Sequence, residues 1–143
     1  MAGNPANPVN TTWIGRKWEL WSHRTLFPDA ILVTSADRNA PYDIDADGAR
    51  INVKASKLYR KKHGQYFDFL LKSTGENCDY FLCVGYRRKT DRDPLRVWLI
   101  PSCLVLDKYR LTIGRNHAGQ WAEFERKFVT HRSKGTDLLR GAM

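Results

Sequence analysis

The strongest local constraint on the fold is a hairpin signal in residues 41–56, PYDIDADGARINVKAS. Asp47-Gly48 is a residue pair that favours the tight, positive-φ turns joining antiparallel strands. After this turn the sequence alternates between apolar and polar residues, as a strand with one buried face does. The alternation places Asn52 and Lys54 on the same face, opposite the apolar residues.

The segments around the hairpin predict further strands with a helix at each end. Helices are expected at residues 13–27 and 118–128, and strands at residues 30–36, 66–72, 78–86 and 95–102. The basic segment 56–65 is expected to form a loop or a short helical turn. This order predicts an α/β fold in which helices flank a mixed central β-sheet.

The length of 143 residues suits one domain with its own core. We expect a flexible N-terminal arm at residues 1–12, a single domain at residues 13–130 and a basic C-terminal tail at residues 131–143. No apolar run is long enough for a transmembrane helix, and the polar N-terminus does not resemble a signal peptide. The three cysteines lack CxxC spacing, which favours reduced thiols and a cytoplasmic location.

The formal net charge of +9 favours a polyanionic partner through counterion release. A charge that serves only solubility is the simpler alternative, but the basic residues are clustered rather than dispersed. The two clusters contain Lys57, Arg60, Lys61 and Lys62, and then Arg87, Arg88 and Lys89. Tyr59, Tyr66 and Tyr86 lie beside these charges, where aromatic rings can stack or pack near a phosphate backbone. The clusters therefore predict nucleic-acid binding.

The expected helix at residues 13–27 carries an apolar stripe. The stripe contains Ile14, Trp18, Trp21 and Leu26. Three tryptophans on one short helix, Trp13 included, are more apolar surface than a monomer readily hides, which favours a homo-oligomer. Glu19 lies off the stripe among basic residues, where a surface ion pair is the simpler interpretation.

The hairpin also carries residues suited to phosphodiester cleavage. This reaction requires a divalent cation to offset phosphate charge, an oriented and acidified water, and a positive charge near the reacting phosphate. Mg²⁺ needs only one or two carboxylates, because it keeps several waters. A carboxylate on one strand, with a polar oxygen two residues before a lysine on the next, meets these needs.

Three segments together resemble the PD-(D/E)XK nuclease superfamily. They are GRKWE at residues 15–19, PYDI at residues 41–44 and INVKAS at residues 51–56. The resemblance is nearest to the branch with intron-encoded homing endonucleases and archaeal Holliday-junction resolvases, and it covers residues 13–104. It implies a restriction-endonuclease-like fold and a Mg²⁺-dependent endodeoxyribonuclease, with Mn²⁺ as a possible substitute, that leaves a 5′-phosphate and a 3′-hydroxyl.

The resemblance also implies a role for each matching residue. Asp43 would be the principal metal ligand, with Asn52 as a second ligand and the Val53 carbonyl nearby. Lys54 would orient the water or stabilise charge at the phosphate. Glu19 would hold Lys54 or the water of a second metal ion. The residues implied to lie near the DNA backbone are Ser56 and Lys57.

One position departs from the family pattern. The usual acid two residues before the lysine is Asn52, whose amide offers one neutral oxygen and binds Mg²⁺ more weakly than a carboxylate does. Asn52 is therefore either a variant ligand or the mark of an inactive nucleic-acid-binding module on the same fold. An RNA-binding protein without nuclease ancestry is a further alternative, and it predicts that Asp43 and Lys54 do not converge.

A calcium loop is a weaker interpretation of the same segment. Asp43, Asp45 and Asp47 precede Gly48 with EF-hand spacing, but that loop needs a bidentate glutamate six residues after the glycine. Lys54 occupies this position, and strands rather than helices flank the turn. Asp45 and Asp47 are therefore expected to be turn residues.

Overall fold

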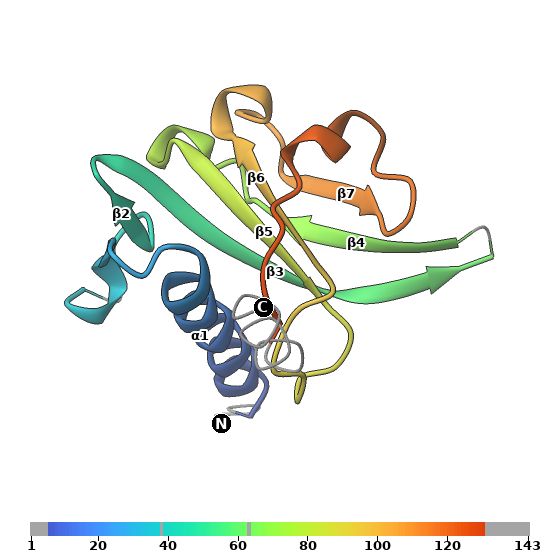
Figure 1. Ribbon diagram of the computed structural model, residues 1–143, viewed down its shortest axis with the longest axis horizontal. Helices are drawn as coiled ribbons and strands as arrows, with labels where there is room; N and C mark the ends of the chain where they lie inside the picture. Colours follow the sequence, from blue (N-terminus) through green and yellow to red (C-terminus); the bar gives the residue numbers. More distant parts are fainter. Residues whose placement is uncertain (1–5, 38, 63, 131–143) are drawn as a thin grey trace, which may run out of the picture.

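The computed structural model describes residues 6–37, 39–62 and 64–130, with side chains from residue 13 onward. Within these ranges one α-helix, α1 (Ala6–Leu26), precedes seven strands (Figure 1). The strands are β1 (Ile31–Leu32), β2 (Ile44–Ala46), β3 (Ala49–Lys61), β4 (Gly64–Leu70), β5 (Tyr80–Tyr86), β6 (Arg96–Pro101) and β7 (Arg110–Gly114). Short 3-10 helices lie at Val33–Ser35, Gly75–Asn77, Ser102–Leu104 and Gly119–Phe124.

The long strand β3 organises the sheet. It pairs with β2 and β4 in antiparallel fashion and with β5 in parallel, from Ile51 opposite Tyr80 to Lys57 opposite Tyr86. β6 extends the sheet from β5, and β7 extends it from β4, both antiparallel. The result is a mixed sheet, as expected from the sequence.

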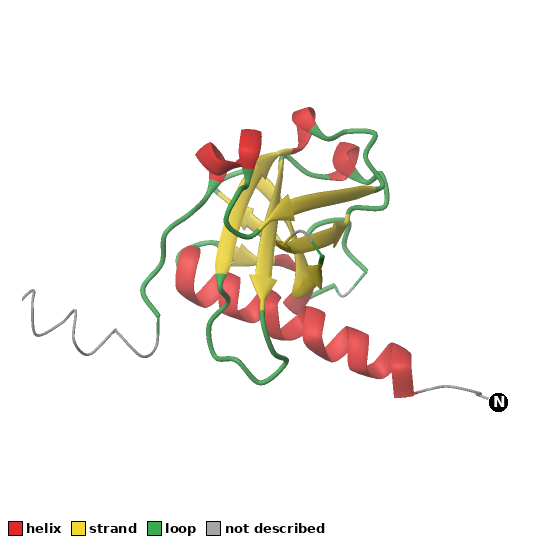
Figure 2. Cartoon of the chain, turned by 90° about the vertical axis from the view of Figure 1, so that its right-hand side faces the viewer, coloured by secondary structure: helices red, strands yellow, loops and turns green. Residues whose placement is uncertain are grey.

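Two cores cover the two faces of this sheet. On one face, α1 lies along the strands (Figure 2), and its Trp18 and Trp21 pack with Ile51 and Val84. On the other face, apolar residues of β4 and β7 pack with those of β5 and β6. Gly85 is required there, because the ring of Phe67 would lie 2.6 Å from a Cβ at that position.

The α/β class is confirmed, but the expected arrangement of helices is wrong. Helix α1 begins at Ala6, so residues 6–12 of the expected arm are helical. Residues 118–128 form only a six-residue 3-10 helix, Gly119–Phe124. Within the described ranges, α1 therefore covers one face alone, and β4 and β7 take the place of a helix on the other. Residues 1–5 of the expected arm and the expected tail 131–143 lie outside the described residues.

The basic segment is part of a hairpin rather than a loop or helical turn. β3 continues to Lys61, and β4 begins at Gly64, with Tyr59 opposite Tyr66. The alternation of the preceding strand simply continues through the basic residues. Ser56, expected near a DNA backbone, is buried, and its hydroxyl accepts the Asp68 N–H at 2.9 Å and so joins β3 to β4.

The predicted apolar stripe of α1 is confirmed. Trp18 and Trp21 are buried within the chain, while Trp13 is 57% exposed. Of the three tryptophans that suggested a homo-oligomer, only Trp13 therefore contributes exposed apolar surface. No helix in the described ranges combines the length and apolar character needed to cross a membrane.

Candidate active site

The backbone around Asp43 is fixed where β2 leaves β3. The last pair of these strands on this side is Ile44 opposite Ile51. Asp43 precedes this pair, and its N–H donates to the Ile51 carbonyl at 2.9 Å, while its carbonyl accepts the Val33 N–H at 2.8 Å. These two hydrogen bonds hold the Asp43 side chain beside β3.

The Asp43 carboxylate accepts a backbone hydrogen bond from β3 that a neighbouring strand would otherwise accept. Its Oδ2 accepts the Val53 N–H at 2.7 Å. The N–H and carbonyl of one strand residue point to the same edge, so the Val53 carbonyl is directed to the edge that Asp43 occupies. An acid at this position is thus both positioned by β3 and adjacent to a backbone oxygen.

Glu19 reaches the same place from α1. Its carboxyl group shares a hydrogen bond with that of Asp43. The buried Thr34 hydroxyl donates to Glu19 Oε1 at 3.2 Å and accepts a hydrogen bond from Arg16 at 3.0 Å. Glu19 is therefore held by Thr34, which Arg16 holds in turn, and sequence reasoning assigned no site role to either residue.

The electrostatics of Asp43 are unfavourable to its charge. Burial raises its pKa to about 8, and the hydrogen bond and negative charge of Glu19 act in the same direction. The Val53 N–H and the Lys54 ammonium oppose these effects without outweighing them. Near neutral pH the Asp43 carboxyl group is therefore largely protonated, because desolvation and a neighbouring acid both disfavour its charge.

Lys54 lies one residue further along β3. Burial lowers its pKa, while the negative charge of Asp43 raises it and the positive charge of Lys72 lowers it. Cys78 and Cys83 are its other electrostatic neighbours, and burial raises the pKa of the Cys78 thiol to about 11. These thiols are neutral at physiological pH, so Asp43 is the acid that the Lys54 ammonium faces. We call Glu19, Asp43, Val53 and Lys54 the fork site.

Asn52 is not joined to this cluster by a hydrogen bond. It is buried, pairs with Phe81 of β5, and its backbone hydrogen-bonds the Cys78 sulfur. Within the described ranges its side-chain amide makes no hydrogen bond. The structure therefore brings together Glu19, Asp43, Val53 and Lys54, and leaves Asn52 beside them on the Lys54 face of β3.

The donors of the fork site match a hard cation with few protein ligands. The described residues contain no group of three or more His, Cys, Asp and Glu side chains placed to hold a metal. Two carboxyl groups and one backbone carbonyl are what Mg²⁺ uses when it keeps several waters, whereas zinc and calcium sites need more protein ligands. Asp45 accepts the Gly48 N–H at 2.7 Å and Asp47 has φ of 53°, so both act as turn residues.

The expected DNA-contacting residues occupy two surfaces. Lys57, Arg60, Lys61 and Lys62 are exposed on the β3–β4 hairpin, and Arg87, Arg88 and Lys89 are exposed between β5 and β6. The second segment borders a hollow of about 740 Å³ that Arg92 also lines. Lys17 donates to the Lys89 carbonyl, which ties this loop to α1.

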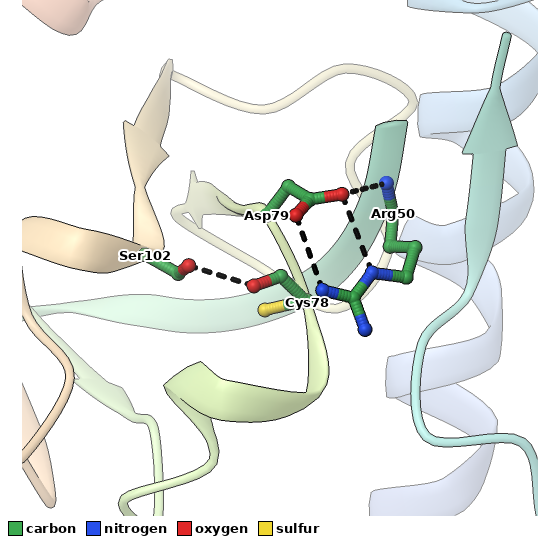
Figure 3. A network of polar contacts seen from close by, with 4 residues as sticks. All are labelled: Arg50, Cys78, Asp79 and Ser102. Carbon is green, nitrogen blue, oxygen red and sulfur yellow. Dashed lines mark hydrogen bonds and ion pairs between the residues drawn. The ribbon is translucent and has the colours of Figure 1, made fainter. Parts of the chain in front are cut away.

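A second polar cluster on β3 was not predicted. Arg50 donates to Asp79 through its backbone N–H at 2.8 Å, its Nε at 3.3 Å and its guanidinium terminus at 3.1 Å (Figure 3). Close by, Ser102 Oγ donates to the Cys78 carbonyl at 2.7 Å. These contacts join the beginning of β3 to the segments that precede β5 and follow β6.

Comparisons with protein families, with curated proteins and with solved structures found no match for this chain.

Proposed function

We propose that this chain is a metal-dependent DNA endonuclease of the PD-(D/E)XK type. The observation that supports the proposal is the convergence of an acid from α1, an acid before β2 and a lysine on β3. Glu19 is distant in sequence from the hairpin that carries Asp43 and Lys54, and all three side chains are half-buried. These are the same three residues to which the family resemblance gives catalytic roles.

Each residue of the fork site has a role in this proposal. Asp43, Glu19 and the Val53 carbonyl would hold a magnesium ion. When bound, such an ion offsets phosphate charge and makes a coordinated water more acidic. The hydrogen bonds from Thr34 to Glu19 and from Val53 to Asp43 keep both carboxyl groups in place, so little reorganisation accompanies binding.

Lys54 would act on the reacting groups directly. A buried lysine with a lowered pKa can exchange a proton more readily than a surface lysine. Its ammonium form can stabilise negative charge that develops on the phosphate, and its neutral form can orient or deprotonate a water. Both actions require the low-dielectric position that β3 provides.

The rest of the molecule is suited to a DNA substrate. The net charge is +9, and exposed basic residues line the β3–β4 hairpin and the loop after β5. Lysine and arginine at such positions bind phosphates by releasing counterions. Cleavage of both strands of a duplex would require two copies of the site, which makes a homo-oligomer part of the proposal.

The test is a cleavage assay on plasmid and long phage DNA with Mg²⁺ or Mn²⁺, compared with EDTA. We expect metal-dependent cutting that the Lys54→Ala variant loses. The matched control is Lys108→Ala, an exposed lysine remote in sequence from the fork site, which should cut like the wild type. Cutting that persists in Lys54→Ala, or that is equal in EDTA, would contradict the proposal.

A DNA-binding module without catalytic activity is the second candidate. The observation that favours it is Asn52, which replaces the usual acid and makes no side-chain hydrogen bond within the described residues. The same assay separates the two candidates. Equal retardation of DNA by the wild type and Lys54→Ala, with no cutting of any substrate, would favour the binding module.

A further inference from the structure

The β3–β4 hairpin carries an exposed pair of aromatic rings. Tyr59 and Tyr66 are directly opposite each other, with ring centroids 5.5 Å apart and planes inclined by 22°. Tyr59 is 39% exposed although it lies in regular strand structure. The two rings are therefore stacked on each other on the outside of the sheet, with Tyr59 exposed and Tyr66 half-buried.

Two lysines flank this pair. Lys57 Nζ lies 5.1 Å from the centroid of the Tyr59 ring, and Lys61 Nζ lies 5.0 Å from that of Tyr66. Strand alternation puts Lys57, Tyr59 and Lys61 on one face. Opposite Lys61 is Gly64, which has no side chain to cover the end of the row. We call Lys57, Tyr59, Lys61 and Tyr66 the tyrosine platform.

The acid closest along β4 does not neutralise the tyrosine platform. Asp68 shares the face of Tyr66 by alternation, but its carboxylate accepts hydrogen bonds from Arg110 at 2.6 Å and from Thr112 at 3.3 Å. The platform thus keeps a positive charge at each end and aromatic surface between.

We propose that the tyrosine platform binds unpaired bases of single-stranded DNA, an inference that rests on the proposed function for the choice of DNA as ligand. The rings would stack on base faces, and the two lysines would move from the rings to the adjacent phosphates. Stacking of this kind tolerates any sequence, because every base has a π-face. The proposal excludes intact duplex as the preferred ligand, since the base faces of a duplex are already stacked on one another.

The position of the platform suggests a substrate with both paired and unpaired parts. Tyr59 lies six residues beyond Val53 on β3, which is about 20 Å at the usual rise of a strand. At about 3.4 Å per nucleotide along one DNA strand, this distance corresponds to roughly six nucleotides. By strand alternation Lys54 and Tyr59 lie on opposite faces of β3, so about six nucleotides is the shortest unpaired strand that could connect the fork site with the tyrosine platform.

The first experiment uses wild-type protein in EDTA, so that cutting does not interfere. Fluorescence anisotropy would measure the affinity for labelled oligothymidylate, for a duplex of the same length and for an abasic oligomer with the same number of phosphates. We expect oligothymidylate to bind roughly 5- to 100-fold more tightly than the abasic oligomer. Equal affinities for these two, or a preference for the duplex, would overturn the proposal.

The second experiment compares tyrosine variants of the full chain. Replacing both residues, in Tyr59→Leu with Tyr66→Leu, should lower oligothymidylate affinity by a similar factor and leave affinity for the abasic oligomer unchanged. The same double replacement by phenylalanine keeps the stacking surface and should bind like the wild type. The matched control is Tyr109→Leu, since Tyr109 is 56% exposed away from the hairpin.

These results are separable from the proposed nuclease activity. A tyrosine pair that only stabilises the hairpin predicts unchanged DNA affinity in any leucine variant that folds, and this outcome would overturn the platform. The wild-type comparison with the abasic oligomer decides the question if the leucine variants do not fold. If the wild type binds oligothymidylate but cuts no DNA with either metal ion, the result would count against the nuclease alone and leave the tyrosine platform standing.

Discussion

Strand β3 carries the basic residues of two acid–base pairs that differ in their electrostatics. Arg50 and Asp79, near its beginning, are about 40% exposed and held by several hydrogen bonds (Figure 3). The Asp79 pKa is lowered, chiefly by the hydrogen bond from Arg50, and the Arg50 pKa is raised by the same contact. Each group therefore stabilises the charged form of the other, as an ordinary surface ion pair does.

Asp43 and Lys54 show the reverse behaviour. Burial raises the Asp43 pKa to about 8 and lowers the Lys54 pKa, so the fold disfavours both charges. A second acid, Glu19, adds to the penalty instead of relieving it. Groups perturbed in this way are concentrated at functional sites, because catalysis and metal binding require what stability alone would remove. Charge is thus favoured in the exposed, well hydrogen-bonded pair and disfavoured in the desolvated pair beside a second acid.

The matched variants Asp43→Asn and Asp79→Asn test most directly whether the two pairs differ in function. Both remove one carboxylate charge and keep the side-chain shape. We expect Asp43→Asn to lower metal-dependent DNA cutting by about 100-fold or more, since it removes a group that acts at the reacting phosphate. Asp79→Asn should cut within about threefold of the wild type. Initial rates on the same plasmid measure both.

An equal loss in the two variants would mean that general destabilisation controls cutting. Thermal denaturation of each variant identifies that case. Retained cutting in a folded Asp43→Asn protein would remove Asp43 from the mechanism and with it the contrast between the two pairs.

The next largest effect is on stability as a function of pH, measured in EDTA. The folded-state pKa of Asp43 is above its unfolded value, so folded protein keeps a proton that unfolded protein loses between about pH 4 and pH 8. Wild-type stability should therefore fall, relative to Asp43→Asn, as the pH rises from 5 to 7. One titrating group can change the free energy of unfolding by at most about 1.4 kcal/mol per pH unit. We expect the wild type to lose about 2 kcal/mol relative to Asp43→Asn over this range. Urea denaturation at several pH values measures it.

Asp79→Asn is the control for this measurement. The Asp79 pKa is lowered, so its stabilisation is present above the unfolded value near pH 4 and is lost only at lower pH. Its stability curve between pH 5 and pH 7 should run parallel to that of the wild type. Parallel curves for Asp43→Asn and the wild type would show instead that the pKa of Asp43 is not raised in the folded protein.

Much of the fork site was predictable, because its signals are local. The Asp47-Gly48 turn fixes the hairpin, and the alternation after it places Lys54 beside the strand edge. The structure confirms the hairpin and the apolar stripe of α1. The surroundings of Glu19 were not predictable in the same way. The β-branched residues of segment 30–36 predicted a strand, but Thr34, which donates to Glu19, lies in a 3-10 helix.

The elements that the sequence did not indicate depend on distant partners. β7 is only five residues long, so its apolar alternation is too short to predict a strand. It forms a strand because it pairs with β4. The basic residues from Lys57 onward suggested a loop, but pairing with β4 from Gly64 overrides that tendency. Arg50 and Asp79 are 29 residues apart, and only the parallel register of β3 with β5 brings them together.

The smallest expected effect is stabilisation by Mg²⁺. An ion present at ten times its dissociation constant stabilises folded protein by about 1.4 kcal/mol, which for a chain of this size is a rise of about 5 °C in Tm. We expect this rise in the wild type and in Asp79→Asn, and no rise in Asp43→Asn, with calorimetry or dye-based melting as the measurement. Metal ions compete with the proton on Asp43, so the rise should be larger at pH 8 than at pH 6. A rise of equal size in all three proteins, at both pH values, would place the ion elsewhere on the surface and leave the buried carboxyl groups of the fork site without a ligand.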